Sequence, residues 1–127
     1  IEAGLPMSGD TIFRIASMSK PVTSAAVLML MEEGKLKLDD PITNWMPEFA
    51  NLSLMKDAEG PVSDVGPAPR AFTIEDLLTH RAGLTYDFTA TGPIAEAYRA
   101  KLGSPLASAY TPDQWLKALG ELPLLYT

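Results

Sequence analysis

Ser17 and Lys20 form a Ser-x-x-Lys motif near the start of the chain. Residues three apart on a helix lie one turn apart on the same face, so the Ser17 hydroxyl and the Lys20 amine can come within hydrogen-bond distance. A serine hydroxyl is a weak nucleophile near neutral pH and needs an adjacent base. A lysine amine can act as that base when burial and nearby positive charge favour its neutral form. The motif therefore suits acyl transfer through Ser17.

A helix predicted from Ser17 to Glu33 would position this motif. Pro21 fits its first turn, and Gly34 follows its last residue, as is common at helix ends. The Ser17 backbone N–H, at the helix start, could bind the oxyanion formed in acyl transfer. The middle of the helix is apolar on all sides, which predicts burial within a larger body. The alternative is that Ser17 is an ordinary N-cap and Lys20 a solvated residue of the first turn.

The remainder of the chain is predicted to be mostly helical, with little strand. Residues 11–16 suit a short extended segment that enters a turn. Helices are expected at 42–46, 74–80, 92–102 and 115–119, and the composition of 56–70 is typical of a surface loop. Capping boxes beginning at Thr73 and Thr111 mark two of these helix starts.

Composition excludes several kinds of site. The 127 residues include 10 basic and 16 acidic side chains, a net charge of −6, and no Lys/Arg cluster, so nucleic acid is not an expected partner. The lack of cysteine excludes disulfides and thiolate metal sites, and one histidine, His80, excludes a multi-histidine site. The longest apolar run, 25–31, is shorter than the roughly 20 residues that span a bilayer. We expect a globular protein with no membrane contact, and the proposed chemistry requires no cofactor or metal.

Four sequence blocks around the motif resemble the serine β-lactamase-like superfamily, specifically class C β-lactamases and family VIII carboxylesterases. In the family's order, they are Phe13–Thr23, Glu32–Ile42, Pro47–Phe49 and Thr73–Leu84. The resemblance implies an α/β (α+β) fold of the β-lactamase/transpeptidase type for the whole protein, of which this chain would be a mainly helical part. Residues 1–127 would form a partial domain, with the N-terminal strands and the C-terminal half of the domain outside them.

The resemblance implies an acyl-enzyme mechanism in which Ser17 is the nucleophile. Lys20 would accept its proton or stabilise the group that does. The family also uses a second acid/base tyrosine and a Lys/His/Trp-x-Gly strand beside the oxyanion hole, and neither motif occurs here. Tyr126 is a candidate for that tyrosine. However, its surroundings are similar to the stretch that precedes the family's Pro-Gly, so we expect the catalytic tyrosine beyond Thr127.

Residues 76–88 hold two further candidate features. Asp76 and His80, one turn apart on the predicted helix, permit a Ser-His-Asp interpretation, but the chain has no Gly-x-Ser-x-Gly elbow, and a structural role for His80 is favoured. Tyr86 and Phe88 match by position a segment that borders the family's substrate cleft. The alternative for this pair is an ordinary aromatic loop packed on the core.

The sequence thus predicts a serine hydrolase, with short-chain acyl esters as the first substrate class. β-Lactams and D-amino-acid peptides are the alternatives within the fold, because one fold hosts many activities. A catalytically inactive binding or scaffold protein is the alternative from another class. The chain alone is expected to be inactive, and its expected partners are a small-molecule ester or lactam and the remainder of its own chain.

Overall fold

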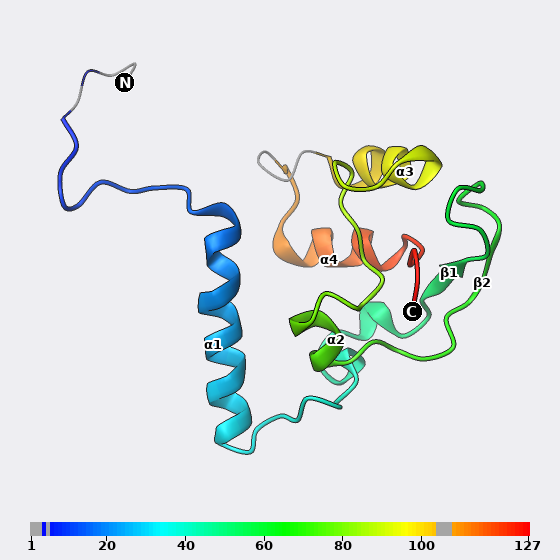
Figure 1. Cartoon of the computed structure of the whole chain (residues 1–127), viewed down its shortest axis with the longest axis horizontal. Coiled ribbons are helices and arrows are strands. Elements are labelled where there is room, and N and C mark those ends of the chain that lie inside the picture. Colours follow the sequence, from blue (N-terminus) through cyan, green and yellow to red (C-terminus); the bar gives the residue numbers. More distant parts are fainter. Residues whose placement is uncertain (1–3, 5, 104–107) are drawn as a thin grey trace. The chain divides into compact units, whose positions relative to one another are not determined.

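The computed structural model describes residues 4, 6–103 and 108–127, and the chain divides into two compact units: the N-terminal unit, 1–35, and the C-terminal unit, 36–127. The N-terminal unit contains a 3-10 turn, Ala16–Met18, and helix α1, Ser19–Glu32 (Figure 1). This confirms the predicted helix, with Gly34 at φ +70° just beyond its end. The expected extended segment at 11–16 forms no strand, and its backbone is irregular up to the turn.

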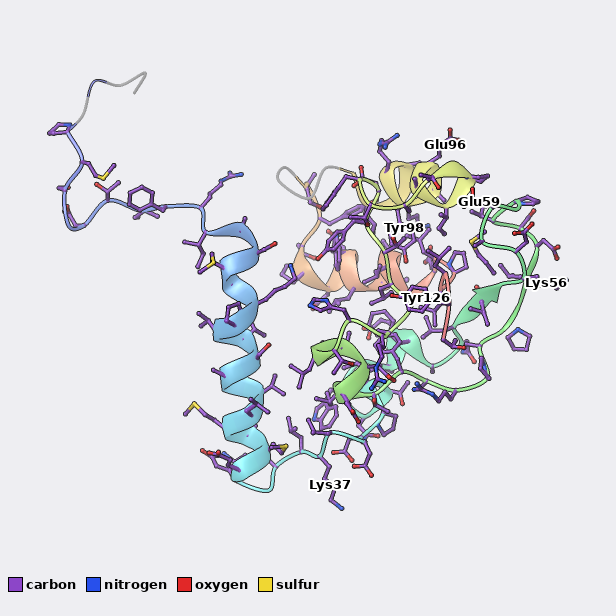
Figure 2. All side chains as sticks on the ribbon, in the orientation of Figure 1. Lys37, Lys56, Glu59, Glu96, Tyr98 and Tyr126 are labelled. Atoms are coloured by element: carbon purple, nitrogen blue, oxygen red, sulfur yellow. The ribbon has the colours of Figure 1, made fainter. Side chains whose placement is uncertain are left out.

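Helix α1 is exposed in the described structure, and its burial within a larger body stays a prediction. None of its residues is buried, and Val22 and Met29 are 68% and 60% exposed. Side chains project from both visible edges of this helix in Figure 2. Apart from α1, the described part of this unit consists of the 3-10 turn and irregular backbone.

The C-terminal unit is mainly helical, as predicted, with one two-stranded sheet. In chain order it contains the 3-10 turns η2 (Ile42–Asn44) and η3 (Pro47–Phe49), strands β1 (Ser53–Met55) and β2 (Val65–Pro67), and helices α2 (Ile74–Leu78), α3 (Gly92–Leu102) and α4 (Pro112–Gly120). Both predicted capping boxes are present, at Thr73 and Thr111. Pro112 occupies the first helical position after the Thr111 cap, and α4 continues to Gly120.

Strand β2 corrects the interpretation of 56–70 as a loop throughout. It pairs antiparallel with β1, with Leu54 opposite Gly66 and Met55 opposite Val65. A three-residue strand containing Gly66 and Pro67 lacks the alternating pattern that identifies strands. Its pairing therefore depends on β1 rather than on its own sequence.

The segment 122–126 lies beside β1 and completes the core of this unit. Leu124 forms a parallel bridge with Leu54, donates its N–H to the Ser53 carbonyl at 2.8 Å, and accepts from the Met55 N–H at 3.0 Å. Its side chain is 1% exposed. All buried side chains of the described residues belong to this unit, and the large apolar ones are Ile42, Phe49, Leu52, Met55, Phe72, Ile74, Ile94, Tyr98, Leu102, Leu119, Leu122 and Leu124.

Gly83 is required where this segment passes the turn after α2. Its φ of +77° is in the left-handed region, and a Cβ placed there would overlap the carbonyl oxygen of Tyr126. The Gly83 carbonyl accepts from the Leu125 N–H at 2.9 Å. Close backbone approach and positive φ both favour glycine at this position.

Candidate functional site

The structure brings the two residues of the Ser-x-x-Lys motif together. Lys20 Nζ donates to Ser17 Oγ at 3.1 Å, within hydrogen-bond distance. Ser17 lies in the 3-10 turn and Lys20 in the first turn of α1, so one local fold positions both. Both side chains are exposed in the described structure, whereas the sequence led us to expect them on a buried helix.

A hydrogen-bonded turn holds Ser17 at the start of α1. The Met18 N–H donates to the Ile15 carbonyl at 2.9 Å, and the Ser19 N–H is directed at the carbonyls of Ala16 and Ser17. Ala16 has φ +44°, a left-handed conformation that is uncommon for alanine. The alanine side chain gives no sequence signal for this conformation, so sequence reasoning missed it.

Tyr86 and Phe88 belong to the C-terminal unit and form an exposed aromatic pair. Their rings stack with centroids 4.8 Å apart and an interplanar angle of 23°. Tyr86 is 46% exposed and Phe88 69%, so neither ring is packed into the core. Arg99 holds the intervening residue, with its Nε 3.3 Å from Asp87 Oδ2.

His80 has a structural position at the end of α2. Its N–H donates to the Leu77 carbonyl at 3.3 Å, and the next N–H, of Arg81, donates to the Asp76 carbonyl at 2.7 Å. These two bonds form a Schellman motif with His80 at the left-handed position, φ +59°. The Tyr126 hydroxyl donates to the His80 carbonyl at 3.1 Å, which gives this tyrosine a structural contact as well.

The Asp76 carboxylate faces Arg70 and Thr73. The Arg70 guanidinium contacts it with both terminal nitrogens, at 2.5 and 3.2 Å, and the Thr73 N–H donates to it at 2.9 Å. The hydrogen bond from Arg70, together with smaller contributions from the Thr73 bonds, lowers the pKa of Asp76 to about 2 against the opposing effect of burial. These contacts leave the Ser-His-Asp interpretation without an Asp–His pair.

A pocket of about 600 Å³ lies beside this ion pair within the C-terminal unit. Its lining includes two arginines that sequence reasoning missed, and both are paired: Arg70 with Asp76, and Arg81 with Glu75 at 3.3 Å. The described residues contain no group of three or more His, Asp or Glu side chains that could hold a metal ion. None of the helices in the described ranges has the length and apolar character needed to cross a membrane.

The amino-acid sequence is similar to those of several known proteins. Protein Rv1367c of Mycobacterium tuberculosis is 52% identical over 126 residues, covering 99% of this chain and 30% of the relative. Esterase EstB of Burkholderia gladioli is 45% identical over 67% of this chain and 19% of its own length. Lovastatin esterase of Penicillium rubens is 34% identical over 79% of this chain and 25% of its own length. The chain thus spans less than a third of the length of these relatives.

The family model described as Beta-lactamase matches residues 1–127. The resemblance in the sequence blocks, the esterase names among the relatives and the mainly helical fold agree with this match. Since the match covers the whole chain, the protein belongs to the Beta-lactamase family.

Proposed function

We propose that the protein is a serine hydrolase that forms an acyl-enzyme on Ser17 and acts as a carboxylesterase on short-chain acyl esters. The observation that carries this proposal is the 3.1 Å contact between Lys20 Nζ and Ser17 Oγ at the start of α1. A nucleophile and its base within about 2.6–3.2 Å are the arrangement that covalent catalysis requires. Relatives named as esterases support the choice of esters.

The proposed reaction has two steps. Ser17 Oγ attacks the ester carbonyl carbon while its proton passes to the Lys20 amine, and the tetrahedral intermediate then expels the alcohol, which takes that proton back from Lys20. Water next attacks the acyl-enzyme, releasing the carboxylic acid and restoring the Ser17 hydroxyl. The Ser17 N–H, at the amino end of the turn, would donate to the oxyanion in both steps.

A serine-directed probe tests the proposal in the whole protein that contains residues 1–127. We expect a fluorophosphonate to add once, on the peptide that contains Ser17, and Ser17→Ala to abolish both the adduct and hydrolysis of p-nitrophenyl butyrate. Ser19→Ala, two residues along the same helix start, is the matched control and should keep both. An unlabelled wild-type protein would favour the inactive scaffold, and an adduct that survives Ser17→Ala would place the nucleophile elsewhere.

Lactam hydrolysis is the second candidate, favoured by the family to which the chain belongs. The same labelled serine would serve both reactions, because each proceeds through an acyl-enzyme. Comparing kcat/KM for p-nitrophenyl butyrate with that for a penicillin separates them. A larger value for the penicillin would reverse our assignment of the substrate class and leave the role of Ser17 intact.

Tyr86 and Phe88 are proposed to contact the apolar part of the substrate. Their support is the exposure of both stacked rings, because exposed aromatic side chains commonly serve binding. Tyr86→Ala should raise KM for p-nitrophenyl butyrate several-fold with little change in kcat. Tyr110→Ala is the matched control, since Tyr110 is also 46% exposed. Equal KM values in the two variants would contradict this role.

A further inference from the structure

We propose that Ala16 is a positioning residue whose left-handed backbone conformation holds Ser17 Oγ beside Lys20 Nζ. The inference deepens the proposed function and rests on Ser17 being the nucleophile. Ala16 has φ +44°, and it directly precedes Ser17 in the turn Ala16–Met18.

The backbone conformation at this position is a departure from local preference. An L-residue in the left-handed region brings its Cβ close to the following carbonyl, and only glycine, and to a lesser extent asparagine and aspartate, adopts it readily. Such conformations persist where the surrounding structure fixes them, and they cluster at functional sites. In the described structure no residue of α1 or of the turn is buried, and the contacts at Ala16 are the hydrogen bonds of the turn.

Hydrogen bonds around Ala16 connect its left-handed backbone to the turn that contains Ser17. The turn closes through the Met18 N–H and the Ile15 carbonyl at 2.9 Å, with Ala16 and Ser17 as its two central residues. The Ala16 carbonyl also receives the Ser19 N–H at the first residue of α1. Ser17 is thereby tied to the helix on one side and to the left-handed residue on the other.

The position of Ser17 relative to Lys20 follows from this turn. Lys20 projects from α1, whereas Ser17 precedes the helix and depends on the turn. A residue at 16 that avoids positive φ would rotate the Ile15–Ser17 backbone and lengthen the 3.1 Å contact while α1 persists. The expected defect is therefore in acylation rather than in helix formation.

We test the inference in the whole protein that contains residues 1–127, with substitutions at position 16 that differ in how readily they adopt a positive φ. We expect Ala16→Gly to keep the maximal rate of fluorophosphonate labelling at Ser17 within about threefold. Ala16→Val should lower that maximal rate about tenfold or more, with the probe concentration at half-maximal rate unchanged, because a β-branched side chain strongly disfavours positive φ. Ala25→Val is the matched control, since it makes the same change within α1 at a position with ordinary helical backbone.

The outcomes separate this inference from the proposed function. The positioning role is supported if Ala16→Val loses labelling while Ala16→Gly and Ala25→Val retain it. All three variants should then show equal helical circular dichroism. Equal rates in Ala16→Val and wild type overturn it and leave Ser17 as nucleophile. A wild-type protein unlabelled at Ser17 overturns both. If Ala16→Val does not fold, Ala16→Leu takes its place in this test, because leucine is not branched at Cβ.

Discussion

The N-terminal unit contains the Ser17–Lys20 pair and no buried residue among those described, whereas the C-terminal unit contains the hydrophobic core. In the N-terminal unit, Ser17 and Lys20 meet across one helical turn, and none of the residues from Ala16 to Glu32 is buried. In the C-terminal unit, a core closes around Leu124, a residue that bridges to Leu54. The Ser17–Lys20 contact thus depends on local backbone geometry, and the core depends on contacts between residues distant in the chain. Substitutions in the two units should therefore have separable effects on acylation and on stability.

Removing the Lys20 amine should produce the largest effect on acylation. Lys20→Met is expected to slow Ser17 labelling by roughly 10²–10⁴-fold, the usual contribution of a positioned base. Stability should change by less than about 0.5 kcal/mol, as for other exposed side chains away from special contacts. Labelling kinetics and urea denaturation measure the two quantities.

Lys35→Met is the control for this change. Lys35 is exposed, lies just beyond α1, and pairs with Glu33 at 2.6 Å. It should leave the labelling rate unchanged. If the two lysine variants lost labelling equally, general electrostatics rather than the 3.1 Å contact would account for the effect.

Closing the space at Gly83 should produce the largest effect on stability. Gly83→Ala adds a strained φ and an overlap with the Tyr126 carbonyl, and we expect a loss of about 2–4 kcal/mol in the free energy of unfolding. Gly34→Ala has a similar φ of +70° with open space around it, so about 1 kcal/mol is expected. Urea denaturation of both variants isolates the overlap. Equal losses would mean that the segment 122–126 does not pass Gly83 closely.

Acid should weaken the C-terminal unit through Asp76. Its pKa of about 2 lies below the ordinary value of 3.8, so the folded state binds fewer protons in this window than the unfolded state. The stabilisation is present above about pH 4 and is lost as the pH falls towards 2. Because Arg70 is half exposed, we expect about 1–2 kcal/mol.

The difference between wild type and Asp76→Asn isolates this contribution from the other acidic groups. Urea denaturation at pH 6, 4 and 3 should show the stability advantage of wild type shrinking as the pH falls. A constant difference across this range would show that the Arg70 contact does not control the titration of Asp76.

The smallest effect is expected from His80→Gly. Glycine relieves the positive φ of +59° at the left-handed position of the Schellman motif, so the variant should gain about 0.5–1 kcal/mol in thermal or urea denaturation. Ser17 labelling should be unchanged. A tenfold slower labelling would revive a catalytic role for His80.

Sequence reasoning succeeded where the determinants are local. The Ser17–Lys20 contact follows from helical spacing, and the capping boxes at Thr73 and Thr111 follow from residues three apart. It failed at β2, whose pairing is supplied by a strand ten or more residues earlier. The apolar pattern of α1 indicates a preference for burial but does not specify the surface that covers the helix, so its burial stays a prediction.

Backbone conformation shows the same division. The residue type predicts a possible positive φ at Gly34 and Gly83. Ala16 and His80 adopt a positive φ that their residue types do not predict. At His80 the Schellman bonds fix the conformation, and at Ala16 the turn before Ser17 does. Residue type alone could not predict either position.

The bridge between Leu54 and Leu124 also fixes an order of events during protein synthesis. About 70 residues separate these partners, and at roughly 5–20 residues per second the ribosome needs about 4–14 s to make them. During that interval β1 can pair with β2, but its parallel neighbour does not yet exist. The turn that carries Ser17 needs only residues up to the first turns of α1, so on the growing chain the Ser17–Lys20 pair can form seconds before the core of the C-terminal unit can close.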